Sequence, residues 1–380
     1  MLKKFAETGG EPPAKLALVP NEYVPTQKIE DSIERTVREY QESGQLPSAL
    51  EDFLHRRRPR IRKRTRGPII RKGEDILAGT LDAVLNMQDT TLCIQGPRGS
   101  GKTHTAAHVI LGLLQAGKRV GISAKSHKSI CHLMGKVAEF ARDEGFSLSA
   151  TKVGGDKDDP LFDRTGIQYK SSIKQAVGKK ALIGGTAWAF SIPDAAGQFD
   201  YLFVDEAGQV CIANLRGMIP STRNVLLLVD QMQLGQSTSG VHPGESGLST
   251  LEYLLQDHAT IPDDLGIFLE QPGGCIPTCA GLFPRRSTIG RLQPEEHTAA
   301  RRILVARSGS VKGRIKEAPA RSLAITREAG LLFIPVEHGS NVQGSDEEVE
   351  VIQRLVSSLL RPVHPHAGNH GNYCIAPQFE

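Results

Sequence analysis

A short apolar run, TLCIQ, leads directly into a glycine-rich loop and then into a segment with helical periodicity. The loop has the pattern G-x-x-x-x-G-K-T and consists of Gly96, Pro97, Arg98, Gly99, Ser100, Gly101, Lys102 and Thr103. Glycines let the backbone curl so that its N–H groups face one centre, and the start of the next helix adds its positive dipole end. This strand–loop–helix order is the context in which the pattern forms a P-loop. The sequence therefore predicts that the loop cradles the phosphates of a nucleotide.

Two adjacent carboxylates follow another apolar run, at Phe203-Val204-Asp205-Glu206. A strand that ends in two acids is usually just solvated, but here it lies about 100 residues after the P-loop. We therefore expect ATP and Mg²⁺ as cofactors. Lys102 would reach the β- and γ-phosphates, Thr103 and Asp205 would be the Mg²⁺ ligands, and Glu206 would deprotonate the attacking water.

Strands and helices alternate through the middle of the chain. Short apolar runs at TLCIQ, KRVGISA, KKALIGG, FDYLFVD and NVLLLVD are separated by helical segments that begin near Lys102 and Ser126. This alternation predicts an α/β fold, a parallel sheet covered by helices on both faces. Later elements are sparser, with expected strands at 266–270, 331–337 and 373–377 and a helix at 345–360 that a capping box between Ser345 and Glu348 would start. We expect an N-terminal helical and basic extension over 1–73, the nucleotide-binding domain over 74–250, and an incomplete second region over 251–380.

The bulk composition excludes several classes of protein. The 380 residues carry a net charge of only +4, and the six cysteines are scattered without paired metal spacing. Such cysteine usage indicates reduced thiols and a cytoplasmic location, and no apolar run is long enough to span a membrane. The basic run between Arg56 and Lys72 could follow nucleic-acid phosphates, or it could be a solvated linker.

A family resemblance rests on several motifs together. Asp205-Glu-Ala-Gly-Gln209 resembles the DEAxQ box of superfamily 1 helicases, and GISAKSHKSI, GGTAW and LLLVDQMQLGQ resemble that family's motif Ia, its next strand-contacting motif and its motif III. The chain is most similar to the helicase half of bacterial RecB-like nuclease–helicase fusions, over residues 65–270 and more weakly over 290–360. The resemblance implies a RecA-like domain, an incomplete second one, and ATP hydrolysis coupled to translocation on single-stranded nucleic acid, DNA rather than RNA, with a separate nuclease domain as an associated partner.

The resemblance also implies roles for individual residues. Gln209 and Gln233 would sense the γ-phosphate, with Gln233 in the catalytic set beside Lys102 and Glu206. Contacts to the sugar-phosphate backbone would come from Ser126, His127, Lys128 and Thr186, although by themselves Lys128 could be a surface lysine and Thr186 an ordinary polar strand end.

Some features depart from the family. Val229 stands where the family has glycine, and the chain ends before the arginine-bearing motif VI. Residues 271–289 have neither helical nor strand periodicity. Yet a set of codons that the genetic code permits for them, read two nucleotides later, spells TWRMHPDVCRFISEAVYD, which resembles motif IV. We hypothesise two compensating frameshifts around this stretch. The alternative function is therefore a truncated helicase relic that binds ATP, and perhaps nucleic acid, with little turnover, because an arginine at the γ-phosphate contributes about 10³–10⁵ in rate.

Overall fold

One parallel sheet organises the described part of the chain. The computed structural model describes residues 25–178, 181–230, 244–256, 258–271, 334–337 and 345–359. Within these ranges eight strands pair in the order β4-β3-β5-β2-β6-β7-β1-β8, and every pair is parallel. The strands are β1 (Thr91–Gln95), β2 (Val120–Ser123), β3 (Ala150–Val153), β4 (Gln168–Lys170), β5 (Leu182–Gly184), β6 (Phe199–Val204), β7 (Thr222–Val229) and β8 (Gly266–Phe268).

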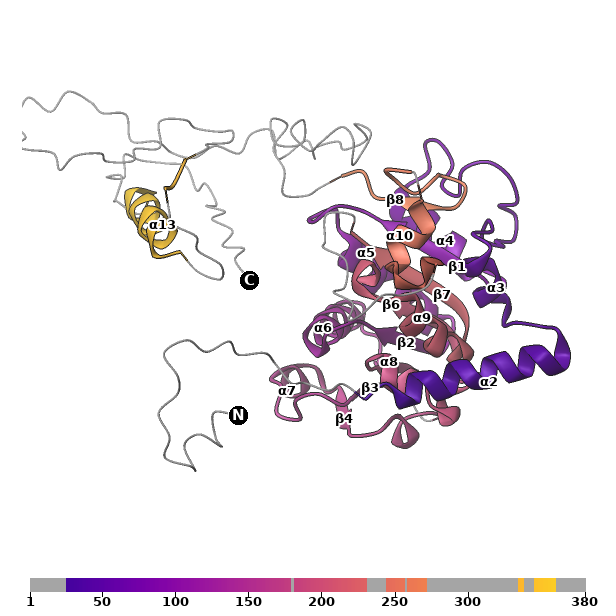
Figure 1. Ribbon diagram of the computed structural model, residues 1–380. Helices are drawn as coiled ribbons and strands as arrows, with labels where there is room; N and C mark the ends of the chain where they lie inside the picture. Colours follow the sequence, from indigo (N-terminus) through magenta and orange to yellow (C-terminus); the bar gives the residue numbers. More distant parts are fainter. Residues whose placement is uncertain are drawn as a thin grey trace, which may run out of the picture.

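Helices cover both faces of the sheet, and the strands alternate between two cores (Figure 1). Cys93 of β1 and Leu227 of β7 contribute to one core, whereas Leu92 and Leu226 contribute to the other. The first core is closed by α2 (Gln27–Ser43), α3 (Ser48–Leu54), α8 (Ala187–Phe190), α9 (Ile212–Met218) and α10 (Thr250–Leu255). The second is closed by α4 (Ile76–Leu85), α5 (Lys102–Gln115) and α6 (His127–Asp143). Because the central strands are buried on both sides, their sequences are continuous apolar runs. The predicted α/β fold class, a parallel sheet covered by helices on both faces, is thereby confirmed.

The N-terminal helices are part of the first core. Helix α2 packs on α9, where Ile29 is buried and the Ser32 Oγ donates to the Gly217 carbonyl at 2.8 Å (Figure 1). A Cβ on Gly217 would lie 3.0 Å from the Ile29 side chain, so the glycine permits this close approach. The buried face of α2 also contains Thr36, whereas Tyr40 is 48% exposed.

The basic run joins this region to the sheet domain. Arg56 pairs with Glu245 at 2.5 Å and lies over the Tyr253 ring, and Arg60 pairs with the buried Asp52 at 3.1 Å. Arg64 is itself buried and forms ion pairs with Glu74 and Asp82 at 2.5 and 2.7 Å. These arginines therefore hold the segment on the domain surface. Other basic residues of the run are exposed (Arg62, Lys63, Arg66 and Lys72), so its contact with nucleic-acid phosphates stays a prediction.

Other predicted elements have mixed outcomes. The structure adds α7 (Leu161–Thr165) and the two strands β3 and β4, which the sequence analysis missed, and residues 334–337 of the expected strand at 331–337 form no strand. The expected helix near the end is present as α13 (Asp346–Leu359), where the Ser345 Oγ accepts from the Glu348 N–H at 3.2 Å. The expected strand at 373–377 and residues 272–289 lie outside the described residues, as does most of the expected second region.

Candidate nucleotide-binding site

The P-loop and the acidic pair lie at the same edge of the sheet. Strand β7 lies between β1 and β6, and all three run parallel, so their carboxyl ends meet. The P-loop follows β1, Asp205 follows β6 and Asp230 follows β7. Ligands of open α/β sheets bind in the crevice outside the carboxyl ends of the strands.

The P-loop has the backbone of a phosphate cradle. Gly99 and Gly101 have φ values of 78° and 80°, a region that other residues rarely adopt. A Cβ on Gly96 would lie only 2.3 Å from the Ser100 Oγ, so a larger residue would displace the loop. That Ser100 Oγ is buried and, among the described residues, has no hydrogen-bond partner. A buried hydroxyl without a partner is costly, and a phosphate oxygen would satisfy it.

Lys102, the first residue of α5, lies over the loop. Its Nζ donates to the carbonyls of Gly96 and Pro97 at 2.6 and 2.8 Å and lies 3.3 Å from the Asp230 Oδ2. Burial lowers the pKa of Lys102, while the carboxylates of Asp230 and Asp205 oppose that shift. The ammonium is therefore held where phosphate oxygens could replace the two carbonyls.

The carboxylates of Asp205 and Glu206 have different environments. Asp205 is 8% exposed, and burial raises its pKa to about 6, with a further contribution from neighbouring Glu206. Its Oδ1 accepts from the Glu206 N–H at 2.9 Å. Glu206 is half-buried, with a left-handed backbone at φ 51°, and its Oε2 accepts from the Ser129 Oγ at 2.8 Å.

These residues fit a nucleotide with Mg²⁺. The half-buried Thr103 hydroxyl and the Asp205 carboxylate are hard oxygen donors of the kind that Mg²⁺ prefers, and Mg²⁺ usually takes only one or two carboxylates beside phosphates. Gln209 follows Glu206 on a short 3₁₀ helix (Ala207–Gln209), where its N–H donates to the Glu206 carbonyl at 2.8 Å. Gln233 lies outside the described residues.

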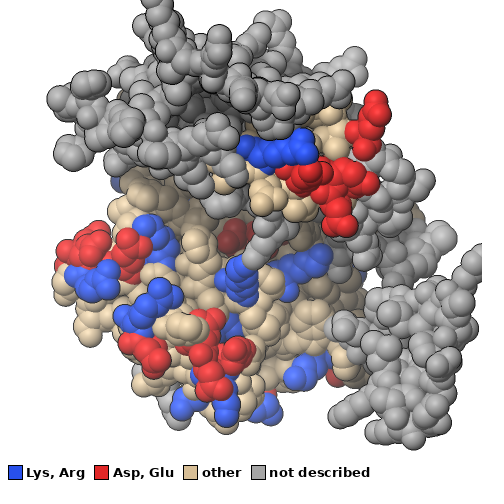
Figure 2. Space-filling view, turned by 90° about the vertical axis from the view of Figure 1, so that its left-hand side faces the viewer, with Lys and Arg blue, Asp and Glu red and all other residues tan. Residues whose placement is uncertain are grey.

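The residues expected to contact nucleic acid lie at the same sheet edge. Ser126 caps α6 after β2, Thr186 precedes α8 after β5, and β2 pairs with β5. Lys128 is exposed, whereas the His127 Nδ1 lies 2.7 Å from the Nζ of Lys152, which is buried. Lysine and arginine side chains are interspersed with acidic ones on the described part of the face in Figure 2. The geometry groups these residues without assigning their partner.

Sequence reasoning missed three residues at this edge. Ser129 contacts Glu206, Lys152 contacts His127, and Asp230 contacts Lys102. Only Asp230 carried a signal, because it directly follows an apolar strand as Asp205 does. The other two contacts join residues that are 77 and 25 positions apart.

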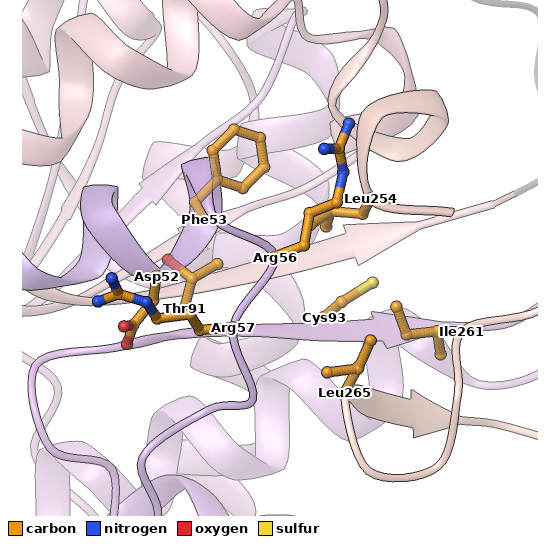
Figure 3. A pocket seen from close by; sticks show the side chains of 9 residues that line it. All are labelled: Asp52, Phe53, Arg56, Arg57, Thr91, Cys93, Leu254, Ile261 and Leu265. Atoms are coloured by element: carbon orange, nitrogen blue, oxygen red, sulfur yellow. The ribbon is translucent and has the colours of Figure 1, made fainter. Parts of the chain in front are cut away.

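A separate cavity between α3 and β1 is too small for a nucleotide (Figure 3). Its volume is about 20 Å³, enough for about one water molecule. Cys93 lines it, and burial raises the pKa of that thiol to about 12, so the thiol stays protonated.

Comparisons with known proteins agree with the position of the P-loop. A family model described as an AAA domain matches residues 78–184, which include the loop. Similar solved structures include the arterivirus nonstructural protein 10 helicase with DNA, at 15% identity over 54% of this chain and 41% of that one, with a TM-score of 0.35. The UvsW helicase of bacteriophage T4 is 13% identical over 58% of this chain and 67% of that one, with a TM-score of 0.31. The chain thus spans less than half the length of the arterivirus helicase. No curated protein matches.

None of the helices in the described ranges combines the length and the apolar character needed to cross a membrane.

Proposed function

We propose that this chain is a superfamily 1 helicase-type ATPase that hydrolyses ATP in response to single-stranded nucleic acid, DNA rather than RNA. One observation carries the proposal: the P-loop and the Asp205–Glu206 pair meet at one sheet edge, with Lys102 close enough to Asp205 for their charges to interact. The DEAxQ subfamily, a separate nuclease partner and a cytoplasmic location belong to the same proposal. They rest on the resemblance of the sequence motifs and on the cysteine usage.

Each residue at the edge has a chemical task in this proposal. The Lys102 ammonium exchanges the Gly96 and Pro97 carbonyls for phosphate oxygens. Thr103 and Asp205 hold Mg²⁺, which supplies charge neutralisation at the phosphates when bound. Glu206 accepts the proton of the attacking water, and Gln209 and Gln233 sense the γ-phosphate. Ser126, His127, Lys128 and Thr186 contact the strand backbone.

The decisive experiment is a steady-state ATPase assay with and without oligo-dT or oligo-U. We expect Mg²⁺-dependent turnover that single strands stimulate, more strongly for oligo-dT. Lys102→Ala should abolish binding of a fluorescent ATP analogue, whereas Glu206→Gln should keep binding and lose turnover. Exposed Lys28→Ala and Glu39→Gln on α2 are the matched controls, since both lie far along the chain from the loop and should behave as the wild type.

The outcomes separate the two candidate functions. ATP binding that requires Lys102, without turnover under any condition, would identify the helicase relic. Equal nucleotide affinity in the wild type and in Lys102→Ala would refute both.

A further inference from the structure

Two serine hydroxyls connect the start of α6 to Glu206. The Ser129 Oγ lies 2.8 Å from the Glu206 Oε2 and also 2.8 Å from the Ser126 Oγ. Ser126 is the N-cap of α6, and its Oγ accepts from the Ser129 N–H at 3.0 Å. The contact with Glu206 spans 77 positions, so only the fold creates it.

The directions of these hydrogen bonds follow from proton counting. An ionised carboxylate can only accept, so Ser129 must donate its single hydroxyl proton to Glu206. In the pair of hydroxyls, Ser126 is then the donor and Ser129 the acceptor. The resulting order is Ser126 to Ser129 to Glu206. A hydroxyl that accepts a hydrogen bond is itself a better donor, so Ser126 strengthens the bond to the carboxylate.

Glu206 is held by this bond in a conformation that needs support. Its φ of 51° is unusual for a residue with a Cβ, and such conformations persist only where surrounding contacts fix them. The hydrogen bond from Ser129 joins its carboxylate to a helix outside its own turn. Ser129 thus restrains the position of the Glu206 carboxylate.

We infer that Ser129 is a positioning residue that restrains Glu206 until a nucleic-acid strand reaches the start of α6. The inference rests on the proposed function, because it requires a strand that binds beside Ser126 and Lys128. A phosphate oxygen at this helix terminus would accept the Ser126 hydroxyl proton and remove it from Ser129. The bond from Ser129 to Glu206 would weaken, and Glu206 would be freed to accept the proton of water. Strand binding would thereby raise turnover.

The first test is the ATPase rate of Ser129→Ala. We expect the strand-free kcat to rise about tenfold, which corresponds to about 1.4 kcal/mol, and stimulation by oligo-dT to fall towards one. KM for ATP should stay unchanged, because the hydroxyl of Ser129 is engaged with Ser126 and Glu206 and not with the phosphate cradle. Ser129→Thr keeps the hydroxyl and should restore stimulation. Exposed Ser147→Ala, after the same helix, is the matched control and should leave both rates unchanged.

The second test needs no turnover. Coupling between two sites is reciprocal. If strand binding weakens the hydrogen bond from Ser129 to Glu206, then removing that hydrogen bond must make the strand bind more tightly. Glu206→Ala, which removes the acceptor, should therefore lower the Kd for oligo-dT several-fold in the wild-type background and much less in the Ser129→Ala background. This double-mutant cycle removes the effect of charge alone, which both backgrounds share.

The outcomes distinguish the inference from the function on which it rests. A chain that responds to oligo-dT equally with and without Ser129→Ala would overturn the inference and leave the proposed function standing. An identical effect of Glu206→Ala in both backgrounds would do the same. A wild-type chain that neither binds oligo-dT nor responds to it would overturn both.

Discussion

Replacing Asp205 with asparagine should stabilise the nucleotide-free protein. The side chain is 8% exposed, and burial raises its pKa from 3.8 to about 6. At pH 8 the folded protein holds this carboxylate ionised at a cost of up to about 3 kcal/mol, the free energy that corresponds to that pKa difference. The amide of the Asp205→Asn variant carries no charge, yet it keeps an oxygen that can accept from the Glu206 N–H. In a domain of this size we expect Tm to rise by about 4–10 °C.

The dependence on pH gives the prediction its sign. The folded-state pKa lies above the unfolded one, so the wild type gains stability as the pH falls from above about 6 to below 3.8. The advantage of Asp205→Asn should therefore be full at pH 8, shrink through this window and vanish below it. Thermal unfolding followed by circular dichroism at several pH values measures this. Exposed Asp163→Asn is the control and should change stability by less than about 0.5 kcal/mol.

Added nucleotide should reverse which of the two proteins, the wild type or Asp205→Asn, has the higher Tm. Mg²⁺ with an ATP analogue should raise the Tm of the wild type, since the ion compensates the buried charge, and should raise that of Asp205→Asn much less. A nucleotide-free Asp205→Asn protein with a Tm at or below the wild-type value at pH 8 would refute the reasoning about burial.

Three further predictions concern the framework of the site. Arg64→Ala should lower the free energy of unfolding by about 3 kcal/mol in urea titrations, because it leaves Glu74, whose pKa Arg64 lowers to about 2, without its partner. The control, exposed Arg62→Ala, should lower it by less than about 0.5 kcal/mol, and equal effects of the two substitutions would contradict the burial of Arg64. Cys93 should resist thiol-labelling reagents at pH 8 until the protein unfolds, as peptide mass mapping can show, and rapid native labelling would contradict the burial that raises its pKa to about 12. Gly101→Ala should lower the free energy of unfolding by about 1 kcal/mol in the same titrations, because the φ of 80° disfavours a residue with a Cβ. No atom lies within 4 Å of the Cβ position, so the effect comes from the backbone alone, and an unchanged stability would argue against the left-handed backbone.

The parts of the site that were predictable are those that a local pattern determines. The P-loop needs glycine at left-handed positions such as Gly99 and Gly101, so its steric requirements are visible in the sequence. The central strands were recognisable because burial on both faces makes them continuously apolar. Asp205 and Glu206 were found because a strand of this kind ends at them.

The parts that were missed depend on distance in space. Strands β3 and β4 have four and three residues, and β4 at the sheet edge is partly exposed, so neither shows a clear apolar run. Lys152 is 1% exposed, and its ammonium contacts His127 and the carbonyls of Val153 and Gly154, an arrangement that no local sequence pattern indicates. The contact of Ser129 with Glu206 required the sheet to bring α6 beside the end of β6. The buried face of α2 includes two small polar residues, Ser32 and Thr36, whose hydroxyls donate to backbone carbonyls, so an apolar pattern alone does not reveal it.

The packing of α2 and α3 on the first core has a consequence for synthesis of the chain on the ribosome. Both helices emerge before the sheet. The partner of α2, helix α9, is made more than 150 residues later, as the Ser32–Gly217 contact, 185 positions apart, illustrates. Helix α3 packs on the early strand β1 and also on the late strand β7. Until α9 and β7 are made, the core that buries Ile29, Leu50 and Phe53 is incomplete. Contacts of such long sequence separation slow folding, because the intervening loop must close before they form. The domain therefore cannot complete its fold cotranslationally from the N-terminal side onward, and α2 reaches its final place only after α9 has been made.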